Sequence, residues 1–177
     1  MELFIVNTRG EDERAGKHVK SLALPRLKSV SVTIRTLSPD DRQQWGALWD
    51  GYLKFYAHEL SEDQTSLTWE RLLHSDAGLN ALVAEQEGEL VGFAHYWWTP
   101  STWIENQDLY LEDLFVKTDA RGAGVARALF EELVEICKKN GGIKVHWQTH
   151  KNNSVARSLY DRLGKLSEFV VYEIKVD

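Results

Sequence analysis

Apolar residues recur along the chain with two different periods, and each period predicts one kind of element. A spacing of three and four positions predicts amphipathic helices after Ser38, around Thr65–His74, over Val125–Lys139 and after Asn153. Alternating or β-branched apolar runs predict strands, because successive side chains of a strand point to opposite faces. The predicted strands are Ser29–Thr36, Leu79–Glu85, Leu90–Trp98, Asp108–Val116, Ile143–Thr149 and Leu166–Val176, the last as one or two strands.

Capping and turn residues mark the ends of these elements. Ser38–Pro39 is a helix start, because serine accepts from first-turn amides and proline fits the first helical position. Glu87–Gly88 predicts a hairpin turn between two strands. Asn152 or Asn153 caps the last helix, and Gly164 ends it.

The order of these elements predicts the fold class. It runs β-α-α-β-β-β-α-β-α-β, with a further strand if the last run divides, and it indicates an α/β protein with a mixed sheet and helices on both faces. Residues 1–28 mix charges without sustained periodicity. We therefore expect an N-terminal extension, mobile or packed on a partner, outside a single domain of residues 29–177.

Composition narrows the class of protein. A chain of 177 residues with 43% hydrophobic and 27% charged residues is typical of one globular domain. No apolar stretch is long enough for a membrane-spanning helix, and the N-terminus lacks the pattern of a secretory signal. The single cysteine, Cys137, predicts a reducing compartment, the cytoplasm, or the nucleus if a protein is the substrate. The net charge of −6 disfavours nucleic acid as a partner and suits a cationic one.

The stretch DARGAGVARAL, residues 119–129, has three small residues in a row, 122–124, directly before a predicted helix. Small residues leave the first amides of a helix open, and the helix dipole adds partial positive charge there. A phosphate can approach such a backbone closely, so this stretch predicts an anion site. Small residues selected only for helix packing would give the same local pattern.

Three phosphate-binding patterns compete for this stretch. A P-loop needs a Lys-Ser/Thr pair after its second glycine, and none follows. The dinucleotide pattern Gly-x-Gly-x-x-Gly is met by Gly122 and Gly124, but Arg127 occupies the third glycine position. The pattern Arg-x-x-Gly-x-Gly/Ala is met in full by Arg121, Gly124 and Ala126, directly after the strand that ends at Val116.

This last pattern resembles the pyrophosphate loop of the GCN5-related N-acetyltransferases (GNAT). A second motif of that family follows downstream in Asn153, Ala156 and Tyr160, and the resemblance covers roughly Val30 to Val176. LYLEDLFV and GFAHYWWTPSTW look like the diamine and polyamine N-acetyltransferase branch, and VHWQTHKNNSVARSLY is similar to the histone-and-polyamine branch. The family fold is a mostly antiparallel mixed sheet of about six to seven strands with about four helices.

The resemblance implies acetyl-CoA as co-substrate, and the sequence places no metal site beside it. Its pantetheine arm would lie beside the strand end, its pyrophosphate would meet the glycine loop, and Asn153 would bind the arm from the far side. The donor-binding residues that the resemblance implies are Leu114, Phe115, Val116, Arg121, Gly122, Ala123, Gly124, Val125, Ala126, Arg127, Asn153, Ser154 and Tyr160.

The resemblance also implies catalytic and acceptor residues. Tyr160 matches the general acid toward the leaving sulfur; the alternative is a core tyrosine with a satisfied hydroxyl. Strand alternation places Glu112 opposite Asp113 and on the face of Leu114, where Glu112 is the candidate base and ammonium ligand; the alternative is a solvated acid. The acceptor-binding candidates are Phe55, Tyr56, Glu112 and Asp113.

Other side chains give weaker signals. His146 and His150 are four residues apart, but the sequence places no third metal ligand beside them. Cys137 lies on the apolar face of a helix and predicts inert core. Three indoles, of Trp97, Trp98 and Trp103, could line a pocket or an interface, with ordinary packing as the alternative.

The sequence therefore predicts an acetyl-CoA-dependent N-acetyltransferase acting by direct attack in a ternary complex, since no cysteine is placed near the donor site. The predicted acceptor is a primary amine of a polyamine, diamine or other small cation. The alternatives are a protein or histone lysine, an amino acid, or a CoA-binding regulatory module without turnover. Family habit and the aromatic-rich terminal run favour a homodimer.

Overall fold

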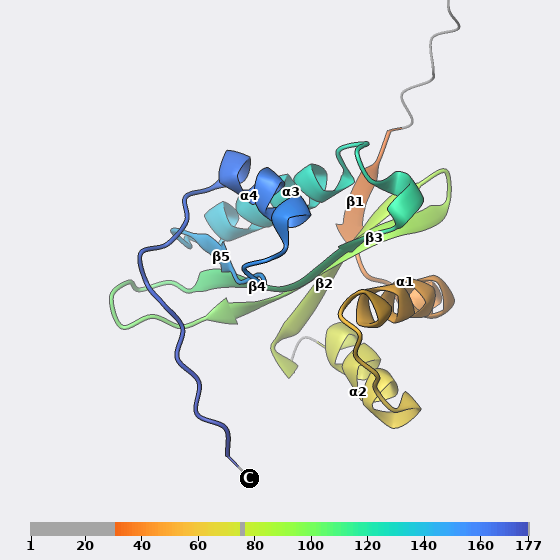
Figure 1. Ribbon diagram of the computed structural model, residues 1–177, viewed down its shortest axis with the longest axis horizontal. Coiled ribbons are helices and arrows are strands. Elements are labelled where there is room, and N and C mark those ends of the chain that lie inside the picture. Colours follow the sequence, from red (N-terminus) through yellow and green to blue (C-terminus); the bar gives the residue numbers. More distant parts are fainter. Residues whose placement is uncertain (1–30, 75–76, 177) are drawn as a thin grey trace, which may run out of the picture.

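The computed structural model describes residues 31–74 and 77–176. The described part holds one five-stranded sheet, four α-helices and two short 3-10 turns (Figure 1). The strands are β1 (Thr33–Thr36), β2 (Leu79–Gln86), β3 (Glu89–Thr99), β4 (Asp108–Val116) and β5 (Val145–Trp147). The helices are η1 (Pro39–Asp41), α1 (Arg42–Phe55), α2 (Glu62–Leu73), η3 (Thr118–Ala120), α3 (Val125–Lys139) and α4 (Ser154–Leu163).

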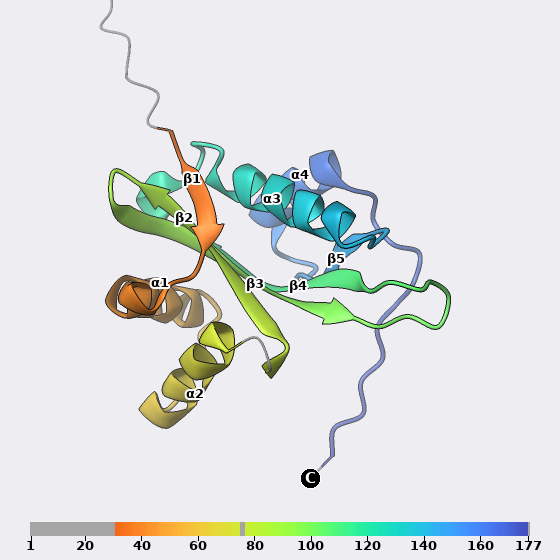
Figure 2. The same ribbon diagram turned by 180° about the vertical axis from the view of Figure 1, so that it is seen from behind.

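The strands lie in the sheet in chain order, β1-β2-β3-β4-β5. All neighbours are antiparallel except β4 and β5, which are parallel. Helices α1 and α2 cover one face of the sheet and α3 and α4 the other (Figures 1 and 2). The predicted mixed α/β class with helices on both faces is confirmed.

Each face of the sheet has its own hydrophobic core, and the helix stripes supply them. On the α1 side, Trp45, Leu48 and Trp49 are buried against Phe93, as the three-and-four spacing predicts. On the α3 side, Leu129 and Leu133 are completely buried against β3 and β4. The pleat of the central strands sends alternate side chains to the two cores, so the sheet is buried on both faces.

The predicted caps and turns are confirmed. The Ser38 hydroxyl accepts from the Asp40 amide, and the Asp41 carboxylate accepts from the Ser38 amide, which together form a capping box. Glu87 and Gly88 both have positive φ, 52° and 85°, as a two-residue hairpin turn requires. Asn153, rather than Asn152, caps α4.

The C-terminal run differs from its prediction. Residues 165–176 form no helix or strand in the structure and run away from the body of the fold (Figure 1). The sheet therefore has five strands among the described residues rather than six or seven. An alternating run becomes a strand only when its backbone bonds to a neighbouring strand, and no described strand lies beside this run. The predicted strand Ile143–Thr149 is shorter in the structure, where only Val145–Trp147 forms β5. The predicted extension, residues 1–28, lies outside the described residues.

Within the described ranges, no helix combines the length and apolarity needed to cross a bilayer. The same residues contain no group of three metal-binding side chains, so His146 and His150 gain no third ligand. Cys137 is buried on α3, where burial raises the pKa of its thiol, and the thiol donates to the Lys144 carbonyl. This is the core position that the sequence predicts.

Candidate active site

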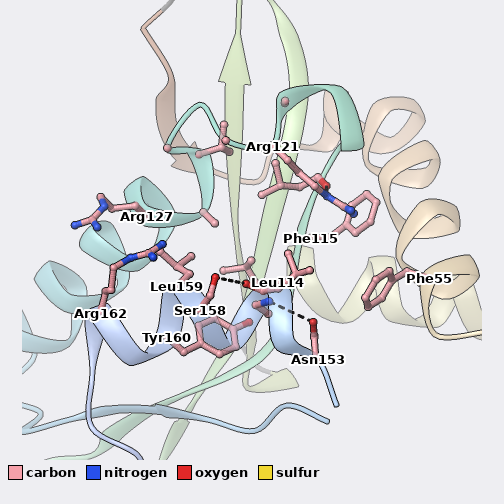
Figure 3. A pocket seen from close by; sticks show the side chains of 18 of the residues that line it. Phe55, Leu114, Phe115, Arg121, Arg127, Asn153, Ser158, Leu159, Tyr160 and Arg162 are labelled. Atoms are coloured by element: carbon pink, nitrogen blue, oxygen red, sulfur yellow. Dashed lines mark hydrogen bonds between the residues drawn. The ribbon is translucent and has the colours of Figure 1, made fainter. Parts of the chain in front are cut away.

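A cavity opens where two neighbouring strands of the sheet separate. β4 pairs with β5 only from Leu109 to Leu111, whereas its pairing with β3 continues to Val116. The space beside the end of β4 is closed by the loop before α3, by α4 and by the end of α1 (Figure 3). The resulting cavity has a volume of about 480 Å³.

The loop before α3 gives this cavity an anion-binding wall. Gly122 and Gly124 have φ of 82° and 88°, a left-handed backbone that favours glycine. Open space surrounds the position where a Cβ would stand on either residue. No side chain caps α3, whereas Ser61 caps α2 and Asn153 caps α4. The first amides of α3 therefore remain available to a ligand, and the helix dipole favours a negative one.

Arginines flank this wall. Arg121 Nε donates to the Val116 carbonyl at 3.0 Å, and its guanidinium lies 5.9 and 5.8 Å from the ring centroids of Phe55 and Phe115. Arg121 thus joins the loop to both β4 and α1. Arg127 lies in the first turn of α3 and also lines the cavity. The loop carries the chemistry expected of a pyrophosphate site.

Tyr160 lies on the α4 side of the cavity (Figure 3). Its ring packs edge-on against Trp147 and Phe130, with centroid distances of 5.3 and 5.6 Å. Burial, and to a lesser extent Tyr56, raises the pKa of Tyr160 to about 12. The hydroxyl therefore keeps its proton at neutral pH and can donate it.

Asn153 lines the cavity with both of its amide atoms engaged inside the protein. Its Oδ1 accepts from the Ala156 amide at 3.3 Å, and its Nδ2 donates to Thr149 Oγ1 at 3.2 Å. The side chain therefore fixes the start of α4, and with it the direction in which Tyr160 projects.

The two acids of β4 lie on one face of the sheet, and the sequence-based prediction that they point apart is wrong. The β3–β4 register shifts between His95 and Tyr96, so that His95 pairs with Asp113 and Tyr96 with Leu111. Glu112 is the extra residue of this bulge, and a bulge interrupts the alternation of side chains. Trp97 Nε1 donates to Glu112 at 3.1 Å from the α1 side, where the Tyr52 hydroxyl donates to Asp113.

Glu112 and Asp113 precede the cavity-lining end of β4 without lining the cavity themselves, and no described cation pairs with them. Among the described residues, no lysine or arginine forms an ion pair with Glu112 or Asp113. Burial, with the charge of Asp113 as a second cause, raises the pKa of Tyr56, which lines the cavity. Tyr56 in turn helps to raise the pKa of Tyr160, so it lies between Asp113 and Tyr160 in this set of electrostatic interactions. The charge of Asp113 therefore reaches the part of the cavity that Tyr56 lines.

The structure brings most of the predicted site together. Of the donor-binding candidates only Ala123 and Ser154 do not line the cavity, and Phe55 and Tyr56 close one end of it. Sequence reasoning missed Tyr52 and His95, which contact Asp113 from elements distant in the chain. The only sequence signal was a histidine inside an otherwise apolar strand. It also missed the cavity residues Ala120, Val155, Ser158, Leu159 and Arg162, and it named Ala156 only as part of the family motif.

The parted strands, the uncapped helix start and the tyrosine on the facing helix together form the candidate active site. The family model for the acetyltransferase (GNAT) family matches residues 43–165, and the chain belongs to this family. It is an N-acetyltransferase, as its named relatives also are.

The relatives and solved structures differ in substrate. D-amino-acid N-acetyltransferase HPA3 of Saccharomyces cerevisiae is 28% identical over 84% of this chain and 93% of its own length. Thialysine N-epsilon-acetyltransferase of Caenorhabditis elegans is 28% identical over 72% of this chain and 79% of its own. A ribosomal-protein-alanine N-acetyltransferase from Brucella melitensis superposes with a TM-score of 0.73 at 24% identity, covering 82% of this chain and all of its own. An aminoglycoside N-acetyltransferase solved with CoA superposes with a TM-score of 0.71 at 21% identity, covering 86% of this chain and 98% of its own.

Proposed function

We propose that the protein transfers the acetyl group of acetyl-CoA to a primary amine of a small cationic molecule, such as a polyamine, a diamine or a lysine-like amine. The observation that carries the proposal is the pair of carboxylates, Glu112 and Asp113, on one face of the sheet with no described cation beside them. An ammonium group is the natural partner of such a pair, since a charge-assisted hydrogen bond is stronger than a neutral one.

The donor side follows from the cavity wall. In the part of the chain that the structure describes, no strand lies on the β5 side of the backbone from Leu114 to Val116, which can therefore bond an extended pantetheine arm. The amides from Gly122 to Ala126, with Arg127 nearby, would bind the pyrophosphate. Gly122 and Gly124 leave the space that a diphosphate needs to approach this backbone.

Acetyl transfer to an amine requires three proton and charge events at the open end of this cavity. Glu112 is exposed and accepts the proton of the ammonium, directly or through one water, so that the neutral amine can attack. A backbone amide near Phe115 or Val116 stabilises the oxyanion. Tyr160 donates its proton to the departing thiolate. The attack is direct, because Cys137 is buried on α3 and engaged with Lys144.

An amino-acid amine is the second candidate acceptor. The similarity to a D-amino-acid N-acetyltransferase and to a thialysine N-epsilon-acetyltransferase favours it. An α-amine carries a carboxylate beside it, which Glu112 and Asp113 would repel, whereas the ε-amine of a lysine-like molecule lies far from its carboxylate. The paired acids therefore favour the side-chain amine over the α-amine.

An amine panel tests the proposal. Release of free CoA would be measured with spermidine, a diamine, a monoamine, lysine and D-amino acids. Multiply charged amines should give the highest kcat/KM, and Glu112→Gln should raise the KM of spermidine more than that of the singly charged monoamine, because the lost interaction is electrostatic. Glu131→Gln on the exposed side of α3 removes the same charge away from the cavity and is the matched control. Equal constants for wild type and Glu112→Gln with every amine would contradict the cationic pocket.

We also propose that two copies associate through the C-terminal run. Apolar side chains of residues 165–176 are 60% to 92% exposed in the single chain. Contiguous exposed apolar surface of this kind marks interaction sites in soluble proteins. The members are Leu166, Phe169, Val170, Val171, Tyr172, Ile174 and Val176.

A further inference from the structure

A chain of hydrogen bonds crosses the core on the α1 side of the sheet and ends at Asp113. Trp45 Nε1 donates to His95 Nε2 at 3.0 Å, and His95 Nδ1 lies 3.0 Å from Asp113 Oδ2. Asp113 Oδ1 accepts from the Tyr52 hydroxyl. His95 is 2% exposed and stacks on Phe93 with a centroid distance of 4.3 Å. The imidazole is thus fixed by aromatic rings and by a partner on each nitrogen.

The partners assign the tautomer of His95. An indole N–H can only donate, so Nε2, which faces Trp45, must be the nitrogen without a proton. The proton of the neutral imidazole then lies on Nδ1, which donates to Asp113. His95 therefore contributes a donor, and no positive charge, to the carboxylate.

Both oxygens of Asp113 accept a hydrogen bond, one from His95 and one from Tyr52. The donors come from different elements, β3 and α1, so they fix the plane of the carboxylate as well as its position. The Asp113 side chain remains 16% exposed, and its charge helps to raise the pKa of Tyr56 at the cavity. The carboxylate is thus held by two donors from the core and keeps part of its surface accessible.

Stability alone does not account for this arrangement. Polar and charged groups buried in an aromatic core are costly to desolvate, and well-packed apolar residues of similar volume often give equal or greater stability. A carboxylate fixed by two donors, with no described cation, is instead the preorganised ligand that a cationic substrate needs.

We propose that His95 and Tyr52 are positioning residues that hold Asp113, as a carboxylate in one orientation, to receive the ammonium group of the acceptor. The inference rests on the proposed function, because it assigns Asp113 to the cationic amine of that reaction. Glu112 is the more exposed acid, which leaves it to take up the proton while Asp113 orients the amine.

The tautomer is testable without any substrate. In ¹⁵N-labelled protein, long-range correlation spectra of the His95 ring should show a protonated Nδ1 and an unprotonated Nε2. The opposite tautomer would overturn the proposal, since Nδ1 would then have no proton to give to Asp113.

Two substitutions of His95 separate positioning from packing. His95→Asn places an amide nitrogen near the Nδ1 position and keeps a donor for Asp113. His95→Gln reaches the Nε2 position and keeps the acceptor for Trp45, but loses the donor for Asp113. We expect His95→Gln to raise the KM of a cationic amine by about tenfold or more, the effect of losing a hydrogen bond to a charged group. His95→Asn should lie close to wild type, and the KM of acetyl-CoA should be unchanged in both.

Tyr52→Phe tests the second donor with little risk to the fold, because the ring is kept. It should raise the amine KM in the same way, whereas Tyr96→Phe, which removes a hydroxyl on the α3 side of the sheet, should not. If His95→Gln and Tyr52→Phe both kept the wild-type KM for the amine, the positioning role would be overturned. An equal rise of the amine KM in His95→Asn and His95→Gln would overturn it as well. If the wild-type enzyme acetylated only the D-amino acids of the amine panel, and none of its cationic amines, the proposed function itself would be overturned, and the panel reports that outcome separately.

Discussion

At the scale of single residues, Tyr160 combines a buried ring with a hydroxyl at the cavity. Trp147 and Phe130 hold the ring, and the burial they cause raises the pKa of the phenol to about 12. The same packing that makes Tyr160 look like a core residue in the sequence therefore keeps it protonated. A core position and an acid role are compatible in one side chain.

Tyr160→Phe should lower kcat by about 10²-fold, because it removes the proton donor and keeps the packing. Steady-state kinetics would measure kcat, and calorimetry would measure CoA binding, which should be nearly unchanged. Tyr96→Phe is the matched control. Full turnover by Tyr160→Phe would mean that another group, or water, protonates the thiolate.

At the scale of elements, the start of α3 is built for a ligand and the start of α1 for stability. α3 begins at Val125 after Gly124, it has no side-chain cap, and the residues of its first turn line the cavity. The turn before α1 instead has a complete capping box and an ion pair between Asp41 and Arg35 at 2.7 Å. Helix starts in one protein thus serve different purposes according to whether side chains occupy their amides.

Gly124→Glu should weaken CoA binding by at least about tenfold, because a carboxylate would stand where the diphosphate meets the helix dipole. Gly88→Glu is the matched control, since Gly88 has nearly the same φ, 85° against 88°, and equally open surroundings in the β2–β3 hairpin. Both variants should lose similar stability from the left-handed backbone. Calorimetric titration that finds equal CoA affinity in the two would remove the pyrophosphate assignment from this loop.

Asp41→Asn should destabilise the fold by about 1–3 kcal/mol at neutral pH, because it breaks the bond to Arg35 and half of the capping box. The Arg35 guanidinium lowers the pKa of Asp41 below its ordinary value of 3.8. The stability that this carboxylate contributes is therefore present above pH 3.8 and lost as the pH falls through the lowered folded pKa.

Urea unfolding at several pH values would check this dependence. The difference between wild type and Asp41→Asn should be largest at neutral pH and shrink in acid below pH 3.8. A difference that stays constant across this range would show that the charge of Asp41 contributes nothing to the effect.

At the scale of the whole molecule, the helices and strands pack their apolar side chains into two cores, whereas the C-terminal run keeps its apolar side chains exposed. The sheet has helices on both faces (Figure 2), and a hydrophobic core lies on each. Residues 165–176 lie outside these cores with their apolar side chains exposed. The single chain therefore leaves apolar surface that a second copy would bury.

Full-length protein should behave as a dimer of about twice 20.3 kDa, and a variant that ends at Gly164 as a monomer. Size-exclusion chromatography with light scattering would measure both masses. Leu67→Ser, which removes an exposed apolar side chain from α2, should remain dimeric. A monomeric full-length protein at micromolar concentration would contradict the proposed association.

The sequence by itself determined the features that depend on local spacing. The ranges of β4 and α3 were predicted to the residue, because apolar periodicity and flanking small residues specify where each begins and ends. The open amides at the start of α3 were also predicted, because small residues without a capping side chain are a property of a short stretch. The glycine loop needs no distant partner to be recognised.

Only the tertiary structure decided how the acceptor side is arranged. Trp45 meets His95 across 50 residues of sequence, and His95 meets Asp113 across 18, so no local pattern signals their contact. Glu112 joins Asp113 on one face because β4 bulges where its register with β3 shifts. A strand's alternation is encoded in its own residues, but a bulge is a property of the pairing between two strands, and it appears only when both are in place.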